Sequence, residues 1–239
     1  MKEISKLLNS SKTVVFMDFE GTQFSQEIVA IGAFKCDLDN KNQIKKIYPG
    51  FKYLVKSHGE VGKIVAKLTG ITDELLEKEG INFLYAIKHF EKYVGKSKNV
   101  KFITYGNFDM RLLHQTAEIE KMSDNSFIKN IYKNYIDFSA ILHKYSRSKK
   151  GNQLSLLDAL QVFRIKPEGD AHDPLYDAKN LMFLYREFLK EKNIVSEEYK
   201  KVLFYNTNYP RPISKVINEL KTKGSVSIDD LEKYIKEDL

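Results

Sequence analysis

Two acidic residues end the apolar run formed by residues 14–17 near the start of this chain. Asp18 and Glu20 follow that run and stand two positions apart. Side chains two apart in a strand point to the same face of a sheet, so the two carboxylates are expected to lie side by side. Two like charges at such a short distance repel each other unless a cation lies between them. The pair therefore predicts a metal site.

Three later residues extend this site. Asp109 follows another apolar run, Asp177 lies in a late helical stretch, and His172 precedes Asp177 by five positions. Taken alone, each has a simpler explanation. Asp109 could cap a helix, and Asp177 could be a first-turn carboxylate stabilised by the helix dipole. An isolated histidine is more often a packing residue. Their order along the chain nevertheless allows all of them to meet at one sheet edge. Carboxylate oxygens are the ligands that Mg²⁺ and Mn²⁺ prefer.

The elements that would position these residues are alternating strands and helices. Short apolar runs predict strands, and the first three, with short polar connections, predict an antiparallel meander. The expected strands cover residues 13–17, 27–34, 43–48, 100–105 and 136–138. Helices are expected from Thr72, from Asp109 and over residues 155–162. Another begins where Asp173 stands as N-cap before Pro174. The pattern predicts an α/β fold with a mixed sheet flanked by helices.

The composition shifts near residue 190. Residues 191–193 are predicted to form a surface turn, and the Pro-containing stretch 205–212 is predicted to be neither regular helix nor central strand. Two short amphipathic segments follow. We therefore expect one domain over residues 1–190 and a small, mostly helical C-terminal extension over residues 191–239.

Bulk properties exclude several classes of protein. The chain has 239 residues with 42% hydrophobic content, as in an ordinary globular protein. Its net charge of +7 suits a polyanionic partner, although solubility alone would explain it equally well. Cys36 is the only cysteine, which excludes an internal disulfide and a thiolate metal cluster. No apolar run approaches the ~20 residues of a membrane span, so we expect a cytoplasmic protein without membrane attachment.

Three short motifs resemble those of the DEDDh 3′–5′ exonucleases. They are Asp18-Phe19-Glu20, residues 105–109 (Tyr-Gly-Asn-Phe-Asp) and residues 172–178 (His-Asp-Pro-Leu-Tyr-Asp-Ala). Residues 68–72 also resemble the loop between the first and second motifs of many members. The resemblance covers about residues 13–189 and implies a ribonuclease H-like fold. Each motif alone is weak, but their order and spacing together are specific.

The resemblance also implies an activity. Asp18, Glu20, Asp109 and Asp177 would hold two Mg²⁺ or Mn²⁺ ions, and His172 would act as general base toward the attacking water. The substrate would be single-stranded DNA or RNA with a free 3′ end, released as nucleoside 5′-monophosphates. The motifs do not separate DNA from RNA.

Four further positions align with family residues that contact the terminal nucleotide: Phe19, Gly21, Thr22 and Asn107. Because Phe19 alternates away from the two carboxylates in the strand, packing in the core is as good an explanation for it as contact with a nucleotide. The competing interpretation is a non-catalytic module that uses the same fold to bind nucleic acid or a partner. In either case the C-terminal extension is a candidate surface for a protein partner or a second copy of the chain.

Overall fold

The structure, a computed structural model, describes residues 2–95, 99–205 and 208–238. These residues divide into two compact units. The first consists of Met1–Ile141 and Ser155–Glu191, and the second of Leu142–Leu154 and Lys192–Leu239. Each unit is described by itself below.

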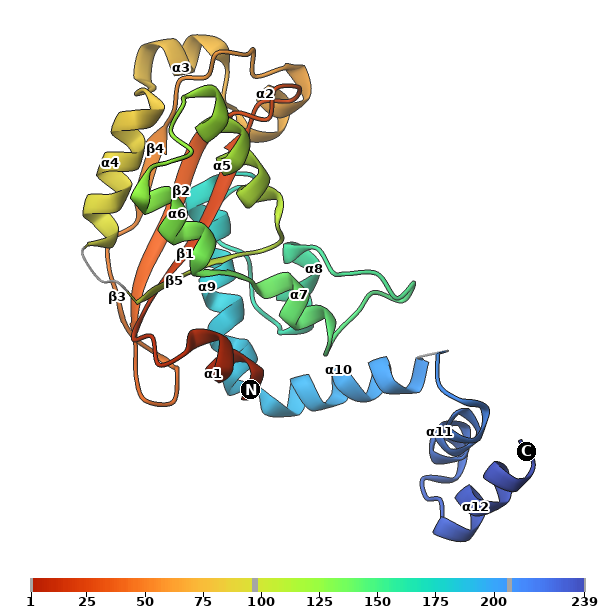
Figure 1. Ribbon diagram of the computed structural model, residues 1–239. Helices are drawn as coiled ribbons and strands as arrows, with labels where there is room; N and C mark the ends of the chain where they lie inside the picture. Colours follow the sequence, from red (N-terminus) through yellow and green to blue (C-terminus); the bar gives the residue numbers. More distant parts are fainter. Residues whose placement is uncertain (1, 96–98, 206–207, 239) are drawn as a thin grey trace. The chain divides into compact units, whose positions relative to one another are not determined.

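A mixed sheet forms the centre of the first unit (Figure 1). Its strands within the described residues are β1 (Thr13–Gly21), β2 (Ile28–Leu38), β3 (Ile44–Ile47), β4 (Phe51–Leu54), β5 (Val100–Thr104) and β6 (Tyr135–Asp137). The order is β3-β2-β1-β5-β6, with β4 also paired to β2. Antiparallel pairing joins β1, β2 and β3, whereas β1, β5 and β6 are parallel. The predicted meander and mixed α/β sheet are confirmed.

Helices cover both faces of this sheet. Those of the first unit are α1 (Lys2–Leu8), α2 (Lys63–Thr69), α3 (Asp73–Glu79), α4 (Phe83–Val94), α5 (Phe108–Ile119), α6 (Ser126–Lys133), α7 (Phe138–His143, which continues into the second unit), α8 (Leu156–Val162) and α9 (Pro174–Lys190). Helix α9 lies on one face, and α4, α5 and α6 lie on the other (Figure 1). The expected cap of α9 is confirmed, since Asp173 accepts a hydrogen bond from the Leu175 N–H and Pro174 opens the helix.

The alternation of β1 divides its side chains between two parts of the core. Met17 and Phe19 pack with apolar residues of α4, α5 and α6 in one cluster. Phe16 points to the opposite face, where its ring lies 5.2 Å from that of Tyr185 in α9. Asp18 and Glu20 share the parity of Phe16, so the first motif points toward α9.

The structure corrects three local predictions. Strand β4 was missed because four residues are too few to show a clear period. The turn predicted at residues 191–193 is wrong beyond Glu191, since α10 begins at Lys192. Within 205–212, Tyr205 ends α10, residues 206–207 lie outside the described residues, and α11 begins at Arg211. Pro212 fits there because a first-turn residue needs no intrahelical hydrogen bond from its nitrogen.

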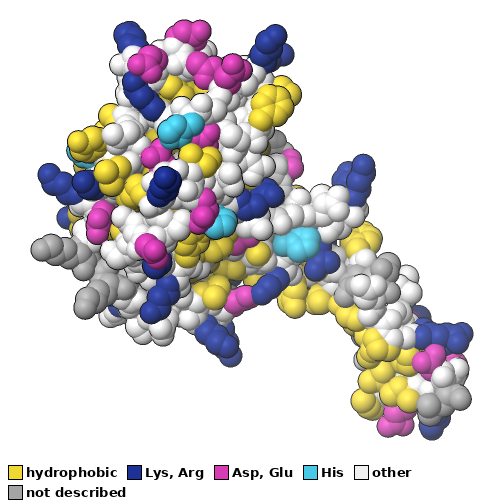
Figure 2. All heavy atoms as spheres, turned by 45° about the horizontal axis from the view of Figure 1, so that its top comes forward, with side chains coloured by type: hydrophobic (Ala, Val, Ile, Leu, Met, Phe, Trp, Pro, Cys, Tyr) yellow, Lys and Arg dark blue, Asp and Glu magenta, His cyan; other side chains and the backbone are white. Residues whose placement is uncertain are grey.

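The second unit contains three helices in its described residues: α10 (Lys192–Tyr205), α11 (Arg211–Lys223) and α12 (Ile228–Lys236). A Ser227–Asp230 capping box starts α12. The segment Leu142–Leu154 attaches to α10, where the Ser146 hydroxyl donates to Glu198 at 2.8 Å. Hydrophobic side chains gather on this unit beside lysines and arginines (Figure 2). The domain boundary at residue 190 stays a prediction. Within the described chain, no helix combines the length and apolarity that crossing a membrane requires.

Candidate active site

The end of β1 carries the first two carboxylates. Strand β1 pairs with β5 only as far as Phe16, so its last residues extend past their parallel neighbour. The register with β2 shifts between Glu20 and Gly21, an irregularity of the kind that re-aims side chains beside active sites. Asp18 and Glu20 are both half-buried on the α9 side of this extension. Parallel strands that end at one sheet edge commonly frame a ligand site there.

Asp109 closes the other side of this strand end. It lies in the first turn of α5, and its side chain is buried, with the residue only 5% exposed. Its Oδ1 accepts the backbone N–H of Phe19 at 2.8 Å, a donor that β5 does not pair. Asp109 therefore stabilises the backbone of the first motif in addition to contributing a charge. The alternative of a simple helix cap does not describe this long-range bond.

Helix α9 reaches this edge because a glycine opposes Asp18. Gly32 pairs with Asp18 in the β1–β2 ladder. A Cβ at this position would lie 2.1 Å from the carbonyl carbon of Pro174 and 2.3 Å from the Leu175 nitrogen. Only glycine allows the first turn of α9 to approach the sheet this closely. That approach delivers Asp177 to the first motif.

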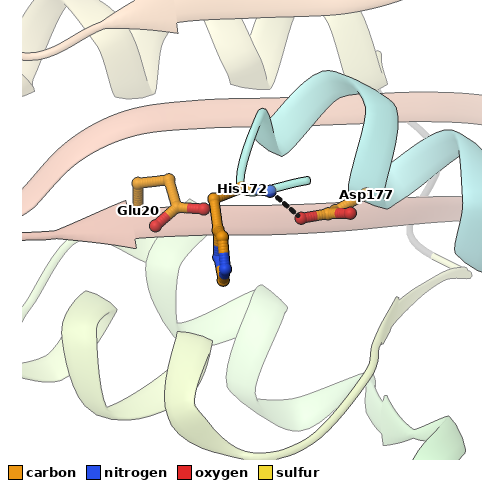
Figure 3. Close-up of side chains that lie close together, drawn as sticks. All are labelled: Glu20, His172 and Asp177. Carbon is orange, nitrogen blue, oxygen red and sulfur yellow. Dashed lines mark hydrogen bonds between the residues drawn. The ribbon is translucent and has the colours of Figure 1, made fainter. Parts of the chain in front are cut away.

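Glu20, His172 and Asp177 form the tightest group. One potential ligand atom from each residue lies within 4.8 Å of the other two. In Figure 3 the two carboxylates flank His172, whose backbone N–H donates to Asp177 Oδ2 at 3.0 Å. His172 is exposed and has a φ of 66°, in the left-handed region that non-glycine residues rarely adopt. Such a conformation persists only where the surrounding structure enforces it.

A buried asparagine, which the sequence alone did not single out, supplies part of that enforcement. Asn180 is 2% exposed and lies one turn after Asp177. Its Oδ1 accepts the Glu168 N–H at 3.0 Å, and its Nδ2 donates to the Glu168 carbonyl at 3.0 Å. Lys52 of β4 adds an ion pair to Asp173 at 2.6 Å. The loop that carries His172 is thus held at both ends. The available signal was a polar residue within the apolar stripe of α9.

We expect Asn180→Ala to lower kcat about ten- to a hundredfold with a smaller change in KM, because misplacement of a reacting group by about 1 Å has effects of this size. Steady-state kinetics on a short oligonucleotide would measure it. Lys179→Ala is the matched control, since Lys179 contacts the same Glu168 through an ion pair at 2.5 Å without bonding its backbone. Equal losses in the two variants would contradict a role for Asn180 in holding the loop.

All four carboxyl groups of the site have raised pKa values, and burial is the largest cause in each. Burial raises the pKa of Asp18 well above its usual value, and the charges of Asp109, Glu20 and Asp177 raise it further. Burial, followed by the charge of Asp177, raises the pKa of Glu20 to about 8. Burial raises the pKa of Asp109 to about 7 despite its bond from Phe19. The pKa of Asp177 is also raised, chiefly by burial.

Among the described residues, no lysine or arginine forms an ion pair with Asp18, Glu20, Asp109 or Asp177. A set of unpaired, mutually repelling oxygen donors is the chemistry that suits a hard divalent cation. The residues therefore fit Mg²⁺ or Mn²⁺, and the positive charge would restore the carboxylates to their ionised form.

The raised pKa values predict a pH-dependent stability of the metal-free protein. Folded Glu20 keeps a proton that the unfolded chain releases, so raising the pH from about 4.5 to about 8 favours unfolding. We expect the melting temperature in EDTA to fall across this pH window by about 2–4 °C for each kcal/mol of unfolding free energy that is lost. Glu20→Gln should flatten the fall and the exposed Glu60→Gln should not. A wild-type melting temperature that rises with pH relative to Glu20→Gln would contradict this assignment.

The four residues aligned with nucleotide contacts occupy different surroundings. The Phe19 side chain is 3% exposed within the core, and Gly21 packs on Leu112 of α5. Thr22 is also 3% exposed, and its hydroxyl accepts the Glu27 N–H at 2.9 Å. Asn107 is exposed at the start of α5, and its side chain makes no capping bond. Of the four, Asn107 has the side chain most open to a substrate, and contact by any of them stays a prediction.

Comparison with solved structures identifies the fold. The chain superposes on the nuclease domain of 3′hExo, described as a DEDDh family member bound to rAMP, with a TM-score of 0.58 and 20% identity over 75% of this chain and 92% of that one. It has the fold of the DEDDh exonucleases.

In two other structures of this fold, the region that superposes on this chain is less than two thirds of the neighbour's length. Cell-death related nuclease 4 (CRN-4) matches with a TM-score of 0.60 and 17% identity over 75% of this chain and 64% of its own. E. coli exonuclease I, in complex with a dT13 oligonucleotide, matches with a TM-score of 0.58 and 15% identity over 80% of this chain and 43% of its own. No protein-family model and no curated protein matches the sequence.

Proposed function

We propose that this chain is a metal-dependent 3′–5′ exonuclease that hydrolyses single-stranded nucleic acid to nucleoside 5′-monophosphates. The observation that carries the proposal is the approach of Glu20, His172 and Asp177 to within 4.8 Å at the end of β1, beside Asp18 and Asp109, in a DEDDh fold. These are the four carboxylates and the histidine that the three motifs predicted. A cytoplasmic location, and contact of the C-terminal extension with a protein partner or a second copy of the chain, stay predictions from the sequence.

The residues divide the chemistry between them. Asp18, Glu20, Asp109 and Asp177 would hold two Mg²⁺ or Mn²⁺ ions, which when bound supply positive charge to the attacking and leaving oxygens. His172, with its exposed ring beside Glu20, accepts the proton of the attacking water at a ring nitrogen. The water oxygen forms a bond to phosphorus while the bond from phosphorus to O3′ of the preceding nucleotide breaks, and O3′ takes up a proton from solvent. The products are a nucleoside 5′-monophosphate and a strand with a new 3′-hydroxyl.

The position of His172 supports its role as base. Its backbone N–H is bonded to Asp177, so the ring is anchored next to a metal-binding carboxylate without using either ring nitrogen. The loop that carries it is held by Asn180, which limits the loss of entropy needed to bring the ring to the reacting water. An imidazole ring can both accept and release a proton, which suits it to general base catalysis.

The test is digestion of single-stranded RNA and DNA labelled at either end, with Mg²⁺, with Mn²⁺ or with EDTA. We expect labelled mononucleotide at once from the 3′-labelled strand and a ladder of shortening products from the 5′-labelled strand. EDTA and Glu20→Gln should abolish both, and the ratio of RNA to DNA rates gives the sugar preference. Internal fragments would indicate an endonuclease instead. A folded protein that binds metal but cleaves no strand would support the non-catalytic binding role.

A further inference from the structure

The second unit carries most of the net positive charge of the chain. Leu142–Leu154 and Lys192–Leu239 together hold 13 lysines and arginines against eight aspartates and glutamates, a net charge of +5 out of +7 for the whole chain. Four of these five net charges come from Leu142–Leu154, which contains four basic residues and no carboxylate. A small unit with this charge attracts polyanions and binds them in a salt-dependent manner.

A cleft in this unit adds a specific chemistry to the charge. The end of α10, Tyr209 and the part of α11 from Ser214 to Lys221 line an open cleft of about 340 Å³. Three aromatic residues line it, Phe204, Tyr205 and Tyr209, together with Asn218 and Lys221, and no carboxylate is in the lining. Hydrophobic and basic side chains lie together on this unit in Figure 2. A volume of this order suits a small planar group rather than a large ligand.

Lys221 differs from its neighbours in α11. Lys215 and Lys223 form ion pairs with Glu237 and Glu219. Lys221 forms none among the described residues, and its Nζ lies 5.0 Å from the ring centre of Tyr205 instead. Tyr205 is itself 79% exposed, far more than packing requires. The cleft therefore presents an open aromatic ring and an unneutralised cation side by side.

We propose that this cleft binds single-stranded nucleic acid, with a base stacked on Tyr205 and a backbone phosphate beside Lys221. Stacking on an aromatic ring combined with a nearby cation is the general chemistry of sequence-independent single-strand binding. An acidic peptide would use the charge but not the exposed rings. A duplex would use the charge but presents no open base face. Single strands alone use both features.

This proposal deepens the proposed function, since it adds a second contact with the same class of substrate, but it is tested without turnover. Binding of a fluorescein-labelled 15-nucleotide oligouridylate to the full chain is measured by anisotropy in EDTA. We expect Tyr205→Ala to weaken binding about five- to a hundredfold, from the loss of one stacked base. Lys221→Ala should weaken binding and lower the slope of log K against log salt by about 0.7.

Lys223→Ala is the matched control, because it removes a charge of the same helix outside the cleft. We expect its affinity to stay within about twofold of wild type, and we expect a duplex of the same length to bind more weakly than the single strand. Unchanged affinity in Tyr205→Ala, or equal losses in Lys221→Ala and Lys223→Ala, would overturn the proposal. Hydrolysis of a small chromogenic phosphodiester separates the two proposals, since a failure there bears on the carboxylate site and not on the cleft.

Discussion

Asp18→Asn is expected to abolish hydrolysis and at the same time to stabilise the metal-free protein. Asp18 is the carboxylate whose pKa is raised by all three of its acidic neighbours in the site. Removing its charge would remove a proposed ligand for the ions, and loss of one such electrostatic stabilisation costs about a hundred- to a thousandfold in rate. The same change relieves repulsion within the folded state, so the melting temperature in EDTA at about pH 8 should rise.

The measurement pairs single-turnover digestion with thermal unfolding in EDTA and in saturating Mn²⁺. Wild type should gain more stability from Mn²⁺ than the variant does, because ligand binding to the folded state stabilises it by mass action. An inactive variant that melts lower than wild type in EDTA would show structural damage instead of loss of a ligand. A variant with full activity would show that the assignment of Asp18 as a metal ligand is wrong.

Gly32→Ala is expected to cost both activity and stability although residue 32 bears no functional group. The added methyl would lie 2.1 Å from backbone atoms of the first turn of α9, which cannot rotate away as a side chain could. Overpacking of this kind costs about 1–3 kcal/mol of unfolding free energy. The displaced helix carries Asp177, so we expect kcat to fall by about a hundredfold.

Gly50→Ala is the matched control for this change. Its added methyl would lie 2.8 Å from Leu175 Cδ1, the end of a side chain that can move. We expect Gly50→Ala to lower the free energy of unfolding by less than about 1 kcal/mol and to keep most of its activity. Urea unfolding and kinetics on both variants would measure the difference. Similar behaviour of the two would contradict the close approach of α9 to the sheet at Gly32.

The shared face of Asp18 and Glu20 could be predicted from the sequence, because spacing in a strand determines which side chains point the same way. Asp18 and Glu20 required only a period of two, and Asp177 required only that a capped helix follow His172. The approach of that helix to β1 could not be predicted, since it depends on Gly32, which lies in a different strand and has no side chain to attract notice. Long-range packing of this kind leaves no periodic signal.

The same limit explains the features that were missed. Asn180 interrupts an apolar stripe, but its function depends on the path of the loop at Glu168, twelve positions earlier. The bond from the Phe19 N–H to Asp109 joins residues 90 positions apart, and no local rule connects them. Conversely, the predicted break at residues 191–193 failed because charged residues favour a turn and an exposed helix almost equally.

Asp109 makes a structural contact that Asp18 lacks, so the two proposed metal ligands differ in what their substitution would cost. On the proposed function, substitution of Asp18 would leave a folded protein that binds nucleic acid without hydrolysing it. Substitution of Asp109 also removes the acceptor for a buried backbone N–H, at a cost of about 1–3 kcal/mol. Losses of that size lower the abundance of a protein in cells. On the proposed function, an Asp109 variant would therefore lose protein as well as activity, whereas an Asp18 variant would lose activity alone.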